Sequence, residues 1–199
     1  MFTNNPNLSE YFIQNKTQPM ETQTPSIKKN AAQYGLILGL VFAFITAVIY
    51  AVSIELLTKW WLGIIMFLIA LGIGIFSVAK SKAILGGFIS FKQAFTSYFI
   101  TMAIGLFISI IVSILIFVVI DPEAAVYLQE QIVEMTRGMM ESFGAPESEI
   151  NKAIAEMESK NQYSLGSQLQ GFVFQLAFYS VFGLLVALIM RKKDPNAID

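Results

Sequence analysis

The sequence contains neither cysteine nor histidine among its 199 residues. Disulfides, thiolate or imidazole metal ligands, and catalysis by a cysteine or histidine base are therefore excluded. Charge is also scarce, because Asp, Glu, Lys and Arg make up 14% of the residues, whereas a soluble domain carries about 25%. The formal net charge of −1 argues against a nucleic-acid partner, since phosphate binding needs a clustered excess of Lys and Arg. We expect no cofactor, no metal site and no catalytic residues.

Long apolar stretches dominate what is present, since 55% of the residues are hydrophobic. A helix needs about 20 apolar residues to cross the hydrocarbon core of a bilayer. Four stretches meet this requirement without an internal Asp, Glu, Lys, Arg or His, at about residues 31–54, 60–79, 95–120 and 168–190. The sequence therefore predicts an all-α fold in which residues 30–193 form one four-helix membrane domain.

The distribution of Lys and Arg predicts the orientation, because the side that carries more of them stays cytoplasmic. Nine flank one side of the predicted spans: Lys16, Lys28, Lys29, Lys80, Lys82, Lys92, Arg191, Lys192 and Lys193. Four flank the other: Lys59, Arg137, Lys152 and Lys160. We expect a multi-pass protein of the bacterial cytoplasmic membrane with both termini inside. No leader is evident before the first span, so that span is expected to direct insertion.

The loop between the third and fourth spans is predicted to form an extracytoplasmic helical hairpin over residues 122–162. Asp121-Pro122 stops one helix and starts another, and Gly144-Ala145-Pro146 separates the two arms. Helical spacing predicts an apolar seam of Leu128, Ile132, Met135, Met139, Phe143, Ile150, Ile154 and Met157. The first arm would be about 31 Å long, enough to reach beyond the lipid headgroups. Residues 1–29 and 194–199 are predicted to be cytoplasmic tails, the first of them disordered.

Several short segments resemble one known family of four-helix bacterial membrane proteins. They are Tyr34-Gly35-Leu36-Ile37-Leu38-Gly39, the run Gly86-Gly87-Phe88-Ile89-Ser90-Phe91-Lys92-Gln93-Ala94-Phe95, and Ile120-Asp121-Pro122-Glu123. The Met- and Glu-rich loop and the basic stop after the fourth span add to the likeness. From about Asn30 to Lys193 the chain is similar to the family catalogued as domain of unknown function 4199. The resemblance implies a four-helix membrane topology and no known activity.

Small residues recur at four-residue spacing in the spans and predict close helix contacts, either within one bundle or between two copies. They are Gly35, Gly39, Ala70, Gly74, Gly105, Ser109, Ser113, Gly183 and Ala187. Gln175 is the most polar side chain near the middle of a span. We expect it to hydrogen-bond to another helix, with a permeation or ligand site as the alternative.

The loop from Asp121 to Tyr163 holds nine acidic and three basic residues, a net charge of −6. A divalent-cation site is conceivable there, but the charges follow the i,i+4 pattern of a solvated helix surface. Clustered methionines could hold Cu(I), although packing in the predicted apolar seam explains them.

We expect a non-enzymatic protein that associates with the lipid bilayer and with a second copy or another membrane protein. A transporter or channel subunit lined by Ser109 and Ser113 is the alternative, and an intramembrane enzyme the third possibility.

Overall fold

A computed structural model describes residues 23–193, which form six α-helices and no extended strand. The helices are α2 (Gln23–Val52), α3 (Trp60–Ile84), α4 (Phe91–Ile114), α5 (Pro122–Ser142), α6 (Glu147–Ser159) and α7 (Leu165–Met190). A 3₁₀ turn, η2 (Ile54–Thr58), links α2 to α3, and a π-helical segment, η3 (Leu115–Ile120), extends α4. Residues 1–22 of the predicted N-terminal tail and the predicted tail 194–199 lie outside the described residues.

Four of these helices are long and apolar enough to cross a bilayer, which confirms the predicted all-α fold with four candidate spans. The candidate spans are Ile27–Val52, Trp60–Ile84, Phe91–Ile120 and Leu165–Met190. Five of their eight ends differ from the predicted bounds, by two to five residues. Helix α2 begins at Gln23, so residues 23–29 are helical. Helix α4 begins at Phe91, because Ser90 and Gln93 form a capping box that satisfies free N–H groups of the first turn.

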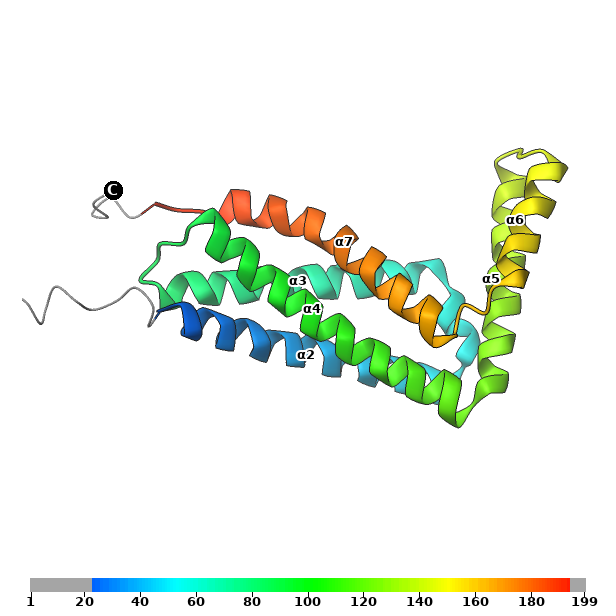
Figure 1. Cartoon of the computed structure of the whole chain (residues 1–199), viewed down its shortest axis with the longest axis horizontal. Helices are drawn as coiled ribbons and strands as arrows, with labels where there is room; N and C mark the ends of the chain where they lie inside the picture. The colour runs from blue at the N-terminus through cyan, green and yellow to red at the C-terminus, as the bar shows by residue number, and fades with distance from the viewer. Residues whose placement is uncertain (1–22, 194–199) are drawn as a thin grey trace, which may run out of the picture.

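Helix α4 is the centre of the bundle and packs against α2, α3 and α7 (Figure 1). Its most extensive contact is with α2, where a glycine of each helix lies opposite a branched side chain of the other. A Cβ added at Gly39 would lie 2.6 Å from Cβ of Ile108, and one added at Gly105 would lie 2.7 Å from Cγ of Leu38. These distances are shorter than any real contact, so the backbones can approach this closely only because glycine has no side chain.

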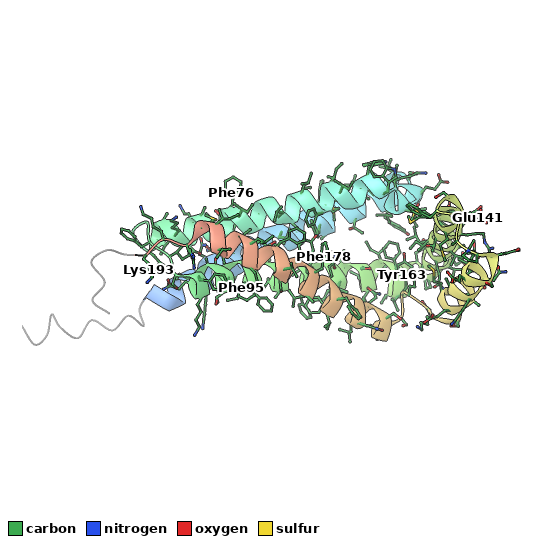
Figure 2. All side chains as sticks on the ribbon, turned by 90° about the horizontal axis from the view of Figure 1, so that it is seen from above. Phe76, Phe95, Glu141, Tyr163, Phe178 and Lys193 are labelled. Atoms are coloured by element: carbon green, nitrogen blue, oxygen red, sulfur yellow. The ribbon has the colours of Figure 1, made fainter. Side chains whose placement is uncertain are left out.

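The outward surface of the four long helices is apolar. Phe44, Phe76 and Phe174 are each at least 68% exposed, and Figure 2 shows Phe76 projecting away from the bundle. A soluble protein rarely exposes so much contiguous apolar surface. This belt is compatible with a multi-pass membrane protein whose lipid-facing side chains replace a polar surface.

Helices α5 and α6 form a pair that lies crosswise over one end of the bundle, while both described chain ends lie at the other end (Figure 1). The expected reach beyond the headgroups requires the pair to extend along the bundle axis. The pair instead lies across this axis (Figure 1). Gly144, with a φ of +72°, makes the reversal between the two helices in a backbone conformation that favours glycine. The first turns of α5 are held down by an apolar cluster that contains Ala124, Leu128, Ile116 and Phe117.

The predicted seam between α5 and α6 is only partly present. Ile150 and Ile154 of α6 are buried, but Met135, Met139 and Phe143 of α5 are exposed, Phe143 by 83%. These three residues share a helix face with Leu128, and Leu128 packs on the end of the bundle instead of on α6. These residues therefore do lie on one face of α5, as their spacing predicts. This face packs on the end of the bundle at Leu128 and is exposed from Met135 onward.

Candidate functional site

A cluster of five buried polar side chains joins α2, α3 and α4 toward the end of the bundle opposite the α5–α6 pair. Its members are Asn30, Ser77, Ser81, Ser97 and Thr101, and none is more than 7% exposed. The side-chain amide of Asn30 donates to the Ser77 carbonyl at 3.1 Å and to the Ser81 hydroxyl at 3.0 Å. The Ser81 and Ser97 hydroxyl oxygens lie 2.7 Å apart. In an apolar surrounding, such mutually satisfied groups hold helices together and fix their register.

Thr101 completes the cluster. Its hydroxyl hydrogen-bonds with the Ser77 hydroxyl at 2.7 Å and donates to the Ala31 carbonyl at 3.1 Å. No member of the cluster is ionisable, and its hydroxyl and amide groups bond to one another. The arrangement can clamp three helices, but it offers no nucleophile paired with a base.

Tyr98 packs α4 closely against the two helices α3 and α7. Its ring lies between Gly74 and Gly183, where an added Cβ would come within 2.5 Å and 2.6 Å of ring carbons. The side chain is fully buried, and its hydroxyl has no hydrogen-bond partner within residues 23–193. The ring thus acts as a packing element that depends on glycine on both sides.

The α5–α6 pair is fixed to the bundle by hydrogen bonds as well as by apolar packing. One carboxylate oxygen of Asp121 accepts from the Ala124 N–H at 3.0 Å, and the other accepts from the Tyr50 hydroxyl at 2.8 Å. These bonds to the charged form lower the pKa of the Asp121 carboxyl, the Ala124 N–H contributing most. The Tyr127 hydroxyl donates to a carboxylate oxygen of Glu55 at 3.2 Å. The start of α5 is therefore tied both to the end of α2 and to η2.

A second set of bonds ties α5 to the segment that follows α6. The side-chain amide of Gln129 donates to the carbonyl oxygens of Met157 and Lys160, at 3.3 Å and 3.0 Å. Its oxygen accepts from the Gln162 N–H at 3.3 Å. The side chain of Gln129 therefore holds the segment between α6 and α7 against α5.

A groove of about 880 Å³ lies between α5, the end of α6 and the segment leading to α7. Its apolar lining comes from Phe117, Val118, Ala125, Val126 and Val133. Its charged lining comes from Glu130, Glu134, Arg137 and Glu158, which gives a net charge of −2. We name this feature the hairpin groove and treat it as the candidate binding site, because its lining combines apolar and charged side chains.

Tyr163 marks the place where the hairpin groove meets α7 (Figure 2). Burial raises the pKa of its phenol to about 12. The hydroxyl therefore stays protonated to a higher pH than in an ordinary tyrosine, and in this form it can donate a hydrogen bond. Because Tyr163 also packs beside Phe117, with ring centroids 5.4 Å apart, its position is set by the bundle end.

The small residues predicted to pack helices lie at helix contacts within the chain. Gly35, Gly39, Gly74, Gly105 and Gly183 each lie where an added Cβ would meet an atom of another helix at 2.8 Å or less. Ala70 and Ala187 are completely buried. Ser109 and Ser113 are half-buried, and neither makes a side-chain hydrogen bond to any part of the chain that the structure describes.

Gln175 is not brought into contact with a polar partner. Its side chain is exposed on α7 and lines a groove between α3 and α7, without a hydrogen bond to any described residue. The acidic residues of the hairpin are also dispersed: within residues 23–193, no three Asp or Glu side chains are close enough to form a candidate metal site.

The sequence prediction missed Asn30, Ser77, Ser81 and Ser97, although a signal for them exists. Ser77 and Ser81 are four residues apart, as are Ser97 and Thr101, so each pair lies on one helix face. Two such pairs on adjacent apolar helices indicate a shared polar contact.

The described fold is a four-helix bundle of candidate spans with an α5–α6 pair across one end. The sequence profile of a family described as "Protein of unknown function (DUF4199)" matches residues 33–192, and the chain belongs to this family. The resemblance found in the sequence is thereby confirmed. No curated protein and no solved structure matches the chain.

Proposed function

We propose that this protein is a non-enzymatic membrane protein that binds a partner protein through the hairpin groove. The observation that carries the proposal is the groove itself, which has apolar side chains and a net charge of −2 in its lining and lies beside a helix tied to the bundle. A partner segment that fits it is amphipathic and basic, with apolar residues on one face and Lys or Arg on the other.

Rigid support favours a binding role for this end of the molecule. A helix pair of this size is marginally stable alone, but here α5 is anchored by Asp121, Tyr127 and the apolar cluster beneath Leu128. A preformed groove loses less conformational entropy on binding than a flexible loop does. The anchoring therefore keeps the charged lining of the hairpin groove in place for a partner.

The orientation that we propose places the α5–α6 pair outside a bacterial cytoplasmic membrane and both termini in the cytoplasm. Eight Lys and Arg residues lie in the described segments that flank the end away from the pair: Lys28, Lys29, Lys80, Lys82, Lys92, Arg191, Lys192 and Lys193. Four lie at the hairpin end: Lys59, Arg137, Lys152 and Lys160. This asymmetry favours a cytoplasmic location for the richer end.

A peptide-binding experiment tests the proposed function. The full chain is placed in neutral lipid nanodiscs, and fluorescence polarisation measures binding of a labelled amphipathic helix with lysines on its polar face. We expect saturable binding that weakens with salt, and at least about tenfold weaker binding for a peptide with glutamates in place of the lysines.

Two double charge-reversal variants distinguish peptide binding in the hairpin groove from nonspecific attraction to acidic residues elsewhere. Glu130→Lys/Glu158→Lys reverses two charges in the lining of the hairpin groove. Glu147→Lys/Glu149→Lys makes the same change at the exposed start of α6. We expect the first pair to abolish peptide binding and the second pair to leave at least half of it. Equal loss in both variants, or no binding by the unmodified chain, would refute the proposal.

A further inference from the structure

A small pocket lies beneath α5 at the start of α3, on a different side of α5 from most of the hairpin groove. It has a volume of about 350 Å³ and is lined by Thr58, Lys59, Trp60, Gln131, Glu134 and Met135. Lys59 and Glu134 bring opposite charges to this pocket, yet they form no ion pair with each other. Both side chains are exposed and free to meet a ligand that itself carries two opposite charges.

An elongated apolar groove continues from the same tryptophan down the side of the bundle. It has a volume of about 460 Å³, lies between α3 and α7, and is lined by Trp60, Gly63, Ile64, Phe67, Gln175, Phe178, Tyr179 and Phe182. The wall is aromatic: the Phe67 ring centroid lies 4.9 Å from that of Phe182 and 5.8 Å from that of Tyr179. Gly63 leaves open space, since a Cβ built there meets no atom within 4 Å.

Trp60 lines both spaces and is 74% exposed. A tryptophan at the start of a spanning helix typically lies at the level of the lipid headgroups. Gly63 and Ile64 lie about one turn, or 5.4 Å, deeper along α3. In that register the charged pocket is level with the headgroups, and Gln175, which lines the same groove as Gly63, lies on the hydrocarbon side of it.

We propose that these two spaces form one binding site for a phospholipid whose headgroup carries a primary amine. Lys59 donates to the phosphate, and the Glu134 carboxylate accepts hydrogen bonds from the ammonium group. The Gln175 amide donates to an ester carbonyl, and one acyl chain lies against Phe67, Phe178 and Phe182. A quaternary amine cannot donate to Glu134, and a headgroup without a cation is repelled by it, so the charge pair selects the primary amine.

The site accounts for Gln175, whose exposed amide would otherwise lie in the hydrocarbon without a partner. An unpaired amide there is unfavourable, because no water replaces the missing hydrogen bonds. The ester carbonyl of a lipid bound in the groove supplies an acceptor. This inference does not rest on the proposed partner binding, since the substitutions that test the hairpin groove leave Lys59, Glu134 and Gln175 unchanged.

Native mass spectrometry of the full chain in detergent tests the site, with dioleoyl phosphatidylethanolamine, phosphatidylcholine and phosphatidylglycerol added separately. We expect one tightly held phosphatidylethanolamine and about tenfold weaker retention of the other two, as the loss of a hydrogen bond to a charged group predicts. Glu134→Gln should remove the preference for phosphatidylethanolamine, Lys59→Gln should weaken all three lipids, and Gln175→Leu should lower retention without changing the preference.

Two matched controls make the same chemical changes elsewhere. Lys80→Gln alters the opposite end of α3, and Glu149→Gln alters the exposed first turn of α6. Both should retain lipid like the unmodified chain, and circular dichroism should show the same helix content in all five variants. Equal retention of the three lipids by the unmodified chain, or equal loss in the controls and the site variants, would overturn the proposal.

Discussion

The ring of Tyr98 fills the space beside Gly183, so that a Cβ added to this glycine would lie 2.6 Å from a ring carbon. The two residues come from α4 and α7, which are far apart in the sequence but adjacent in the bundle. On its other side the ring meets Gly74 of α3 in the same way. A single aromatic side chain thereby sets the separation of three helices.

Replacement of Gly183 by valine should destabilise the bundle, because the branched side chain cannot fit without moving Tyr98. We expect a loss of about 1–3 kcal/mol in unfolding free energy, the usual range for overpacking. Reversible unfolding in mixed micelles, followed by circular dichroism, measures it. Gly171→Val is the control on the same helix, since a Cβ at Gly171 meets no atom within 4 Å. Equal stability of the two variants would show that the contact is not tight.

Thr101→Val should loosen the contact between α2, α3 and α4 at nearly constant volume. The change removes the hydroxyl that bonds to Ser77 and Ala31, and it leaves the Ser77 hydroxyl with the longer contact to Ser97 at 3.2 Å. We expect a loss of about 0.6–1.7 kcal/mol, the range for hydrogen bonds between spanning helices. Ser109→Ala on the same helix is the comparison, because Ser109 makes no side-chain hydrogen bond within residues 23–193. A larger effect at Ser109 would contradict the assignment of the cluster as the clamp.

Asp121→Asn should make the anchoring of the α5–α6 pair independent of acid. The pKa of Asp121 is lowered in the folded protein, so its stabilising contribution is complete above the ordinary value of 3.8 and is lost as pH falls through the lower, folded-state pKa. We expect a nitroxide label at position 148 to be more mobile in Asp121→Asn at pH 7. The difference from the unmodified chain should vanish as the pH falls below 3.8. A difference that persists unchanged in acid would exclude this linkage.

Ile154→Asp should separate α6 from α5, whereas Phe143→Asp should leave the pair intact. Ile154 is 3% exposed against α5, so a carboxylate there is buried without a partner, while Phe143 is 83% exposed. Limited proteolysis of the 143–164 segment measures the difference. We expect rapid cleavage of Ile154→Asp alone, with both variants still inserted in membranes. Similar protection of both would mean that the contact between α5 and α6 lies elsewhere.

The proposed orientation can be read by labelling single cysteines, since the chain contains none of its own. Glu130→Cys lies on the hairpin end, and Lys80→Cys lies at the exposed opposite end of α3. A membrane-impermeant maleimide added to intact spheroplasts should label position 130 at once and position 80 only after lysis. The reverse order would invert the topology.

Much of the fold is predictable because hydropathy and helical period depend on the local sequence. The four spans and the turn at Gly144 follow from such signals, and Gly39 and Gly105 lie at close contacts, as their spacing predicts. Which helix meets which glycine depends on the arrangement of the bundle, and no local pattern contains it. The same limit applies to Gln175, because the period of α7 does not say which face meets lipid.

The α5–α6 pair shows why a correct period can give a wrong contact. Met135 and Met139 continue the face of Leu128, and the sequence predicts that all of this face packs on α6. In the structure Leu128 packs on the bundle end instead, and the face then continues past it into the open. The lining of the hairpin groove depends on this crosswise placement, so the sequence shows the acids but not that they line one groove.

The polar cluster draws its side chains only from α2, α3 and α4, and this has a consequence for biogenesis. A nascent chain that has inserted its third span already holds every partner of Asn30 and Thr101. Helix α7 arrives later and adds apolar packing around Tyr98. Its end is then secured by Lys82, which donates to the Met190 carbonyl at 2.9 Å, and by backbone pairing of Ile89 with Lys192. The order of the helices in the sequence therefore allows the hydrogen-bonded core to form before the last helix closes the bundle.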